Sequence, residues 1–361
     1  MGRASVLCGL GGHVPPHVVT NHDLAQALDT SDEWITSRTG IHRRHVIDTE
    51  TATSDLAVEA ATRALASAGH DAADLLILAT ATPDRACPAT APEVAARLGL
   101  SGIPAFDLSA VCSGFVYSLA TADAFIRAGQ ADRVLVVAAE SFTTLIDPED
   151  RSTRPIFGDG AGAVLLRAGD TAEPGAILGT ELHSDGGLVE LIASEGGGSR
   201  ARGGGDDATP YLRMQGKATY IHAIRSMEQV SRSLLDRVGW RPGDLDAVVG
   251  HQANARILAS LDDKLGLPSD TVAVNIDHLG NTSAASIPLA LVYGAVSGRL
   301  RAGARVLMPA FGGGATWGAV AITWPDVSVV PYEDEALLAL SASNQRTSTI
   351  APGRPDATLS T

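Results

Sequence analysis

Cysteine is scarce in this chain of 361 residues, with only three, at positions 8, 87 and 112. Their spacing fits neither a zinc site nor a disulfide framework, so we expect no metal and a reducing compartment. A phosphate loop is also lacking, because the glycine-rich run EGGGSRARGGGDD has no Gly-Lys-Ser/Thr ending. These absences exclude metal-stapled and disulfide-stapled proteins and P-loop enzymes.

Basic residues are fewer than acidic ones: the chain has 27 Lys and Arg and 41 Asp and Glu, which gives a net charge of −14. This balance argues against nucleic acid as a partner. The stretch MGRASVLCGLGGHVPPHVV lacks the long apolar run of a signal peptide or a membrane span. The sequence therefore predicts a soluble cytoplasmic protein with neither a membrane nor a nucleic-acid partner.

The chain does contain an internal duplication. Four landmarks recur in nearly one register: a glycine at 69 and 239, Asp-Leu at 74 and 244, Arg-Val-Leu at 133 and 305, and small-residue turns at Cys112 and Asn281. The offsets are 170, 170, 172 and 169, and we expect Asn281 to occupy the repeat position equivalent to Cys112.

Each copy combines helical periodicity with strands that are apolar on both faces. Residues 54–69 and 219–239 have apolar side chains at helical spacing, whereas LLILAT and VLVVAA suit a sheet covered on both sides. We therefore predict an α/β pseudo-dimer with halves at 1–172 and 173–325, and catalytic groups where they meet. The Ser-, Thr- and Pro-rich segment 326–361 is expected to be a disordered tail.

Cys112, in the turn SAVCSG, lies between a strand-like run and a helix. That helix has one apolar stripe, formed by Phe115, Leu119, Ala122 and Ile126. A helix N-terminus favours a thiolate, so we expect a pKa below the free value of about 8.5 and a role as acyl acceptor. Taken by itself, a packed structural cysteine is the alternative.

Two further candidates lie in the second copy. His251 follows the strand LDAVV, at a sheet end where site residues gather, and Asn281 lies in the turn HLGNTSAAS. Each alone has a structural alternative, as a buried histidine or a helix cap. The order Cys, His, Asn also occurs in papain-like proteases, but the flanking Ala-Val and Ser-Gly, the missing Trp and the α/β pattern exclude that class.

Six motifs together resemble β-ketoacyl-acyl carrier protein synthase III, from about residue 5 to 325: DEWITSRTGIHRRHV, AVCSGF, RPIFGDGAGAVLL, GHQANARI, GNTSAASIP and FGGGATWGA. The resemblance implies the thiolase-like fold, two βαβαβ-type halves in five αβαβα layers, and a homodimer. It also implies the initiation of fatty-acid or polyketide chains with acyl-CoA and malonyl-acyl carrier protein as substrates, and no metal or redox cofactor.

The same resemblance assigns roles to residues of the site. Cys112 accepts the acyl group, and His251 and Asn281 stabilise the enolate that malonyl decarboxylation leaves, by donating hydrogen bonds. An ionised Asp could not donate. The backbone N–H groups of Cys112 and Gly313 form the oxyanion hole. Phe311 is an apolar wall that disfavours the malonyl carboxylate, with core packing as its alternative.

The resemblance also covers the surface of the site. Trp34, Arg38 and Arg151 are implied to bind the adenine end of coenzyme A, by stacking and charge-assisted hydrogen bonds. Arg256 is implied to dock the carrier protein. An Ile at position 221 replaces a frequent lysine there, and Arg225, one turn later, is a candidate to compensate.

Cys87 stands where family members often have a bulky residue that reaches into the partner subunit's acyl pocket. Its small side chain predicts room for a branched or longer primer, with a free structural thiol as the alternative. Two other activities stay open: acyl transfer to a small-molecule acceptor without condensation, and a non-catalytic scaffold. The intact set of Cys112, His251 and Asn281 argues against the scaffold.

Overall fold

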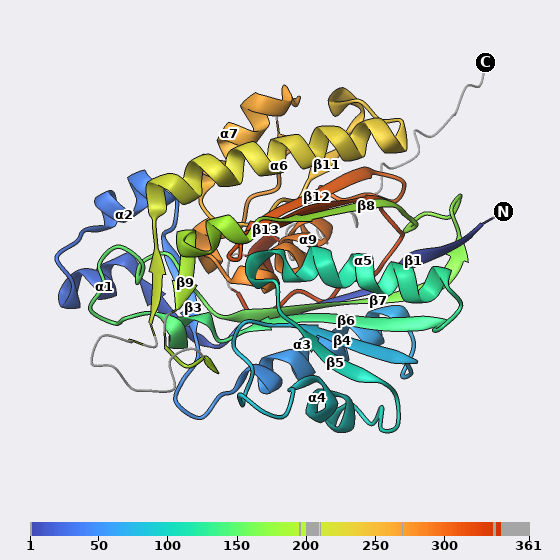
Figure 1. Ribbon diagram of the computed structural model, residues 1–361, viewed down its shortest axis with the longest axis horizontal. Helices are drawn as coiled ribbons and strands as arrows, with labels where there is room; N and C mark the ends of the chain where they lie inside the picture. Colours follow the sequence, from blue (N-terminus) through green and yellow to red (C-terminus); the bar gives the residue numbers. More distant parts are fainter. Residues whose placement is uncertain are drawn as a thin grey trace, which may run out of the picture.

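The computed structural model describes residues 2–194, 196–199, 209, 211–268, 270–334 and 337–340. Its elements form five layers, in which two β-sheets alternate with three layers of helices (Figure 1). Each sheet is therefore covered by helices on both faces. This is the αβαβα order that the family resemblance implies.

The first sheet has the strand order β1-β7-β6-β4-β5. Its strands are β1 (Arg3–His13), β4 (Leu75–Ala79), β5 (Ala105–Leu108), β6 (Arg133–Glu140) and β7 (Gly160–Asp170). β7 runs antiparallel to β1 and β6, whereas β4 runs parallel to β5 and β6.

The second sheet has the order β11-β12-β13-β8 and repeats this pattern. Its strands are β8 (Ile177–Ser184), β11 (Ala247–Val248), β12 (Arg305–Gly312) and β13 (Thr316–Thr323). β13 runs antiparallel to β8 and β12, and β11 runs parallel to β12. The boundary expected at residue 172 lies between the two sheets. Two small sheets pair β2 (His17–Thr20) with β3 (Arg43–Val46), and β9 (Ile192–Ser194) with β10 (Leu212–Met214).

Helices α5 and α9 form the central layer, α3 and α4 cover the outer face of the first sheet, and α6 and α7 cover that of the second (Figure 1). The helices are α1 (Asn21–Ala27), α2 (Asp32–Thr39), α3 (Thr53–Ala68), α4 (Ala91–Arg97), α5 (Gly114–Arg127), α6 (Gly216–Val238), α7 (Ala255–Leu265), α8 (Ile276–Leu279) and α9 (Ser286–Val296). Short 3₁₀ turns are η1 (Val111–Ser113), η2 (Phe142–Leu145), η3 (Gly186–Leu191), η5 (Pro242–Asp244) and η6 (Ser283–Ala285). In the described ranges, no helix combines the length and the apolarity that crossing a membrane requires.

The continuous apolar runs of the strands follow from burial on both faces. In β4, Leu75 and Ile77 pack into the central core, while Leu76 and Leu78 pack into the core beneath α3. Alternate residues of a strand point to opposite faces, so both sets must be apolar. The predicted stripe on α5 is confirmed, because all four of its members are buried in the central core.

The duplication aligns the halves differently from the sequence-based expectation. The turns η1 and η6 begin at Val111 and Ser283, whose φ angles are positive, at 46° and 49°. Their offset of 172 (283 − 111) equals that between the first residues of β6 and β12. Cys112 therefore corresponds to Ala284, and the predicted equivalence of Cys112 and Asn281 is wrong by three residues. The offset changes from 170 to 172 because the segment from Asp244 to Ser283 is two residues longer (283 − 244 = 39) than that from Asp74 to Val111 (111 − 74 = 37).

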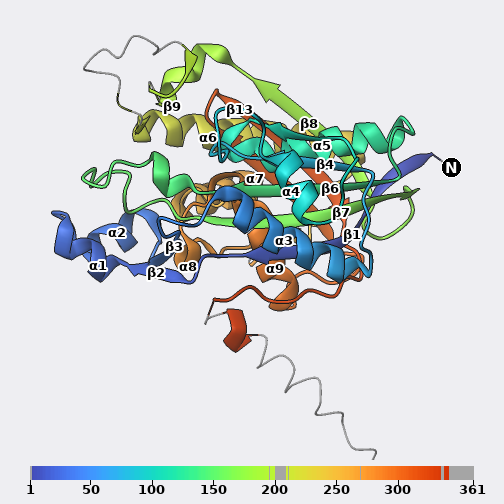
Figure 2. The ribbon, with the colours of Figure 1, turned by 90° about the horizontal axis from the view of Figure 1, so that it is seen from below.

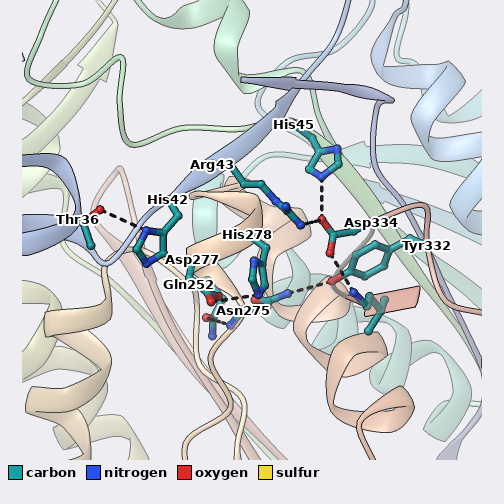
Figure 3. A network of polar contacts seen from close by, with 11 residues as sticks. Thr36, His42, Arg43, His45, Gln252, Asn275, Asp277, His278, Tyr332 and Asp334 are labelled. Atoms are coloured by element: carbon teal, nitrogen blue, oxygen red, sulfur yellow. Dashed lines mark hydrogen bonds and ion pairs between the residues drawn. The ribbon is translucent and has the colours of Figure 1, made fainter. Parts of the chain in front are cut away.

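The segment after residue 325 packs against the rest of the protein through several of its described side chains. Tyr332 and Leu337 are buried, and the Asp334 carboxylate lies 2.7 Å from an Arg43 guanidinium nitrogen and 3.3 Å from His45 Nε2 (Figure 3). Viewed from below, this segment passes under α9 (Figure 2). The expected disorder is therefore wrong for residues 326–334 and 337–340, and residues 341–361 lie outside the described part of the chain.

Asp334 is held as a carboxylate. Burial alone would raise its pKa, but hydrogen bonds from His45 and the Leu337 N–H, with the charge of Arg43, hold that pKa well below its usual range. Asp334→Asn should therefore lower the free energy of unfolding at pH 7 by about 1.5–3 kcal/mol, as expected for hydrogen bonds to a charged group. Urea unfolding measures this, with the exposed Asp326→Asn as the control.

The contribution of Asp334 to the free energy of unfolding should depend on pH. Because the folded pKa of Asp334 lies below the unfolded value of about 3.9, its contribution is present at neutral pH and is lost as the pH falls through the folded value. The difference in the free energy of unfolding between wild type and Asp334→Asn should become smaller below about pH 4. Equal unfolding free energies at pH 7 would show that another contact holds the segment.

Candidate active site

Cys112 lies where the chain passes from the first sheet into the central layer. After β5 ends at Leu108, the chain forms η1 and enters α5. The positive φ of Val111 is rare for a β-branched residue, and such strain persists only where the surroundings impose it. Thr316 of the second sheet supplies one restraint, because its Oγ1 donates to the Ala110 carbonyl over 3.0 Å. The turn thus presents Cys112 at the wall of a cavity, only 5% exposed.

The Cys112 thiol is protonated at neutral pH. Burial raises its pKa to about 12, the nearby Ser283 side chain and the Cys112 N–H act against this rise, and the Glu140 carboxylate adds to it. The expected lowered pKa is therefore wrong for this form of the protein, because desolvation outweighs the helix terminus.

His251 is held from behind by the first residue of α9. Its backbone N–H donates to the Pro309 carbonyl (2.9 Å), and its ring Nδ1 lies 2.7 Å from Ser286 Oγ. Burial lowers the pKa of the imidazole to about 3, so the ring is neutral at physiological pH. His251 lines the same cavity as Cys112. A neutral ring in this place can donate one hydrogen bond without carrying charge.

Asn281 is oriented by backbone contacts. Its Oδ1 accepts the Ser283 N–H (2.9 Å), its own N–H donates to the Ile156 carbonyl (2.9 Å), and its carbonyl accepts the Gly158 N–H (3.1 Å). With Oδ1 occupied, the NH₂ group is the free end of the amide. Asn281 also lines the cavity, which therefore receives a second neutral donor.

The cavity has a volume of about 570 Å³ and brings the chemical groups together. Cys112, His251, Asn281 and Phe311 all line it. Phe311 is 3% exposed, at the end of β12. Within the described residues, no group of three or more His, Cys, Asp or Glu side chains is arranged to hold a metal ion.

The glycine turn after β12 lies against the nucleophile. A Cβ on Gly312 would lie 2.8 Å from the Cys112 nitrogen and 2.9 Å from that of Ser113, so a side chain cannot fit there. Gly313, the next residue, packs against Ile192, which lines the cavity. Gly313 itself is not among the residues that line the cavity.

Trp34, which lines the cavity, has two guanidinium groups over its ring. The Arg38 and Arg151 Cζ atoms are 4.5 and 5.1 Å from its ring centroid. Ser31 caps α2 by accepting the Trp34 N–H, which fixes the start of this helix. Trp34 and Arg38 line the cavity, and Arg151 contacts the Trp34 ring without being part of the lining. All three predicted coenzyme A contacts are therefore brought together.

The two predicted docking residues are placed differently. Arg256 is exposed and lines the cavity, whereas Arg225 is exposed on α6 outside the lining. Asn254 ties α7 to α2, since its Oδ1 accepts the Arg256 N–H (2.8 Å) and its Nδ2 donates to the Arg38 carbonyl (3.0 Å). Lys217 of α6 is another cation of the lining, and the sequence-based prediction missed it.

Cys87 is exposed and does not line the cavity within this chain. The apolar wall beside Cys112 is formed instead by aromatic and aliphatic side chains that were not singled out from the sequence: Phe142, Ile156, Phe157 and Ile192. The rings of Phe142 and Phe157 are 4.8 Å apart. The prediction also missed Ser286, whose only sequence signal is a polar residue opening the apolar helix SIPLALVYGAV.

Two family models match the chain. One is 3-oxoacyl-[acyl-carrier-protein (ACP)] synthase III, over residues 106–186, and the other is its C-terminal counterpart, over residues 235–324. Cys112 falls in the first range, and His251 and Asn281 fall in the second.

Characterised relatives cover nearly the whole chain. Beta-ketoacyl-[acyl-carrier-protein] synthase III 5 of Streptomyces coelicolor is 53% identical over 333 residues, which are 91% of this chain and 100% of that protein. The crystal structure of 3-oxoacyl-(acyl carrier protein) synthase III from Pseudomonas aeruginosa has a TM-score of 0.85 at 51% identity, covering 91% and 100% of the two chains. The priming β-ketosynthase of the R1128 polyketide pathway has a TM-score of 0.86 at 34% identity, covering 91% and 98%.

Matched over nine tenths of its length at this identity, with the same layered fold, the chain belongs to the β-ketoacyl-[acyl-carrier-protein] synthase III family of condensing acyltransferases.

Proposed function

We propose that this enzyme loads an acyl group from acyl-CoA onto Cys112 and condenses it with malonyl-acyl carrier protein to give a 3-oxoacyl-carrier protein and CO₂. The observation that carries the proposal is one cavity shared by a thiol and two neutral hydrogen-bond donors, His251 and Asn281. A hydrolase would need a base for water, whereas a neutral donor pair suits an enolate. No cofactor is part of the proposal.

In the first half-reaction, the Cys112 sulfur attacks the thioester carbonyl, and the C–S bond to coenzyme A breaks. The thiol proton leaves with the departing coenzyme A thiolate, so no external base is needed. The N–H groups of Cys112 and Gly313 stabilise the oxyanion, and losing one such donor typically raises a barrier by about 2.7–4 kcal/mol. The close approach of Gly312 to Cys112 supports this placement.

In the second half-reaction, the bond between the malonyl carboxylate and its carbon breaks, and the electron pair becomes an enolate. His251 and the Asn281 NH₂ donate to the enolate oxygen. The enolate carbon then attacks the acyl group, and Cys112 leaves as a thiolate, which takes up one proton from solvent to restore the resting thiol. Phe311 gives the carboxylate an apolar wall, so the ionised form is disfavoured and its loss as CO₂ is favoured.

Both substrates enter past a cationic rim. Trp34, Arg38 and Arg151 are proposed to hold the adenine end of coenzyme A, with adenine stacked on the indole and the guanidinium groups on phosphate. Arg256 and Arg225 are proposed to dock the acidic carrier protein beside Ile221, which is 55% exposed. We place the enzyme in the cytoplasm, in keeping with its unpaired cysteines.

We further propose a homodimer. β5 forms the outer edge of the first sheet, and its residues are only half-buried in the single chain. An open strand edge of this kind is usually covered, and a second copy would cover it. In such a dimer Cys87, which is exposed here, would face the partner's acyl pocket.

The first test uses the intact mass of the protein after incubation with acyl-CoA thioesters from acetyl to octanoyl. Wild type should gain one acyl group, Cys112→Ala should gain none, and malonyl-carrier protein should discharge the adduct with release of CO₂. Discharge to a small acceptor without CO₂ would indicate an acyltransferase instead. No adduct from any thioester would overturn the loading step.

The second test follows from the raised pKa of Cys112. Below a pKa of about 12, the thiolate fraction rises about tenfold per pH unit, so alkylation of Cys112 by iodoacetamide should accelerate throughout pH 6–9. Mass spectrometry of the Cys112 peptide gives the rate separately from Cys8 and Cys87. A plateau below pH 8 would mean that the thiolate forms in the resting protein.

The third test addresses primer length. Cys87→Phe should reduce acylation by hexanoyl- and octanoyl-CoA by about tenfold while acetyl-CoA keeps its rate, since added bulk in an apolar pocket discriminates by chain length. Cys8→Ser, at a thiol on β1, is the matched control. Equal loss for all thioesters, or wild-type turnover confined to acetyl-CoA, would contradict a role in primer choice.

A further inference from the structure

The side chain of Ser286 lies behind the His251 ring, away from the substrate. Its Oγ is 2.7 Å from His251 Nδ1 and 3.3 Å from the Gln252 backbone nitrogen. Both Ser286 and His251 are only 2% exposed. This contact is therefore dry, and its donor and acceptor roles have to be resolved within the protein.

A serine hydroxyl has one proton and two lone pairs. The Gln252 N–H can only donate, so it occupies a lone pair of Ser286 Oγ. Over the described residues, His251 Nδ1 is the only acceptor within reach of the Ser286 hydroxyl proton. If Nδ1 carried the proton instead, it would donate to the same oxygen, and the hydroxyl proton would be buried without a partner.

The position of the Gln252 N–H is itself fixed. The Gln252 side chain donates to the Gly250 carbonyl (2.9 Å) and to the Ala273 carbonyl (3.1 Å), and accepts the Asn275 N–H (3.1 Å). Asn275 in turn contacts the Tyr332 hydroxyl (Figure 3). The chain just after His251 is thus anchored on both sides, and the N–H keeps its direction toward Ser286.

We infer that Ser286 is a positioning residue that holds neutral His251 in the tautomer with its proton on Nε2, so that this N–H faces the cavity as a donor. The inference rests on the proposed condensation, in which the enolate oxygen needs such a donor. The opposite tautomer would place the Nε2 lone pair against the enolate oxygen, which repels it. The same argument applies to Asn281, because its Oδ1 already accepts the Ser283 N–H, which leaves the NH₂ group to donate.

The test separates the two half-reactions in Ser286→Ala and Ser286→Thr. Ser286→Ala should acylate Cys112 at the wild-type rate. It should transfer the acyl group to malonyl-carrier protein about 10- to 100-fold more slowly, because only a fraction of the His251 rings then has a proton on Nε2. Ser286→Thr, which keeps the hydroxyl, should recover most of that rate. Ser231→Ala, which removes a buried hydroxyl of α6, is the matched control.

A direct readout is the ¹⁵N NMR spectrum of histidine-labelled protein, with the His251 signals assigned from a His251→Gln sample. Wild type should show an unprotonated Nδ1 and a protonated Nε2, and Ser286→Ala should show a shifted tautomer ratio. A protonated Nδ1 in wild type, or wild-type transfer by Ser286→Ala, would overturn the inference. If acylated wild type is never discharged by malonyl-carrier protein, the proposed function fails, and the spectrum alone then decides the tautomer.

Discussion

Exclusion of water at the junction of the two sheets is the constraint on which the site depends. It makes His251 neutral and keeps the Cys112 thiol protonated, so these two reacting groups are hydrogen-bond donors rather than charges. A neutral donor stabilises a developing oxyanion without taking a proton, and in a dry site the interaction is stronger than in water. The same burial requires that each donor be oriented by a partner behind it, as Ser286 and the Ser283 N–H do.

The duplicated fold supplies that geometry. Two turns with positive φ, η1 and η6, face each other from the two halves, and the central helices that follow them are packed in one apolar core. Glu140 at the end of β6 holds η6 to the first half of the chain, because its carboxylate accepts the Ser283 hydroxyl (3.0 Å) and the Ala81 N–H (3.0 Å). Burial raises the pKa of this carboxyl to about 7, and those hydrogen bonds limit the rise.

The open end of the site has the opposite character. Although the chain has a net charge of −14, cationic side chains gather around Trp34 and along the rim. A local positive rim on an acidic protein can attract phosphates and an acidic carrier while the rest of the surface repels them. In the proposed function, stacking, phosphate binding and docking are thus separated from the neutral chemistry inside.

The sequence by itself determined the apolar strands and the α5 stripe, because each depends on local periodicity, and the family resemblance implied the five layers. It also identified Cys112, His251, Asn281 and Phe311, whose motifs are short and contiguous. Only the tertiary structure decided the protonation of Cys112, the packing of Tyr332 and Asp334, the exposure of Cys87 and the contact of Ser286 with His251. Each of these depends on residues that are distant in the chain. A pKa depends on the side chains that bury the group, and a hydrogen bond depends on the partner that the fold places beside it.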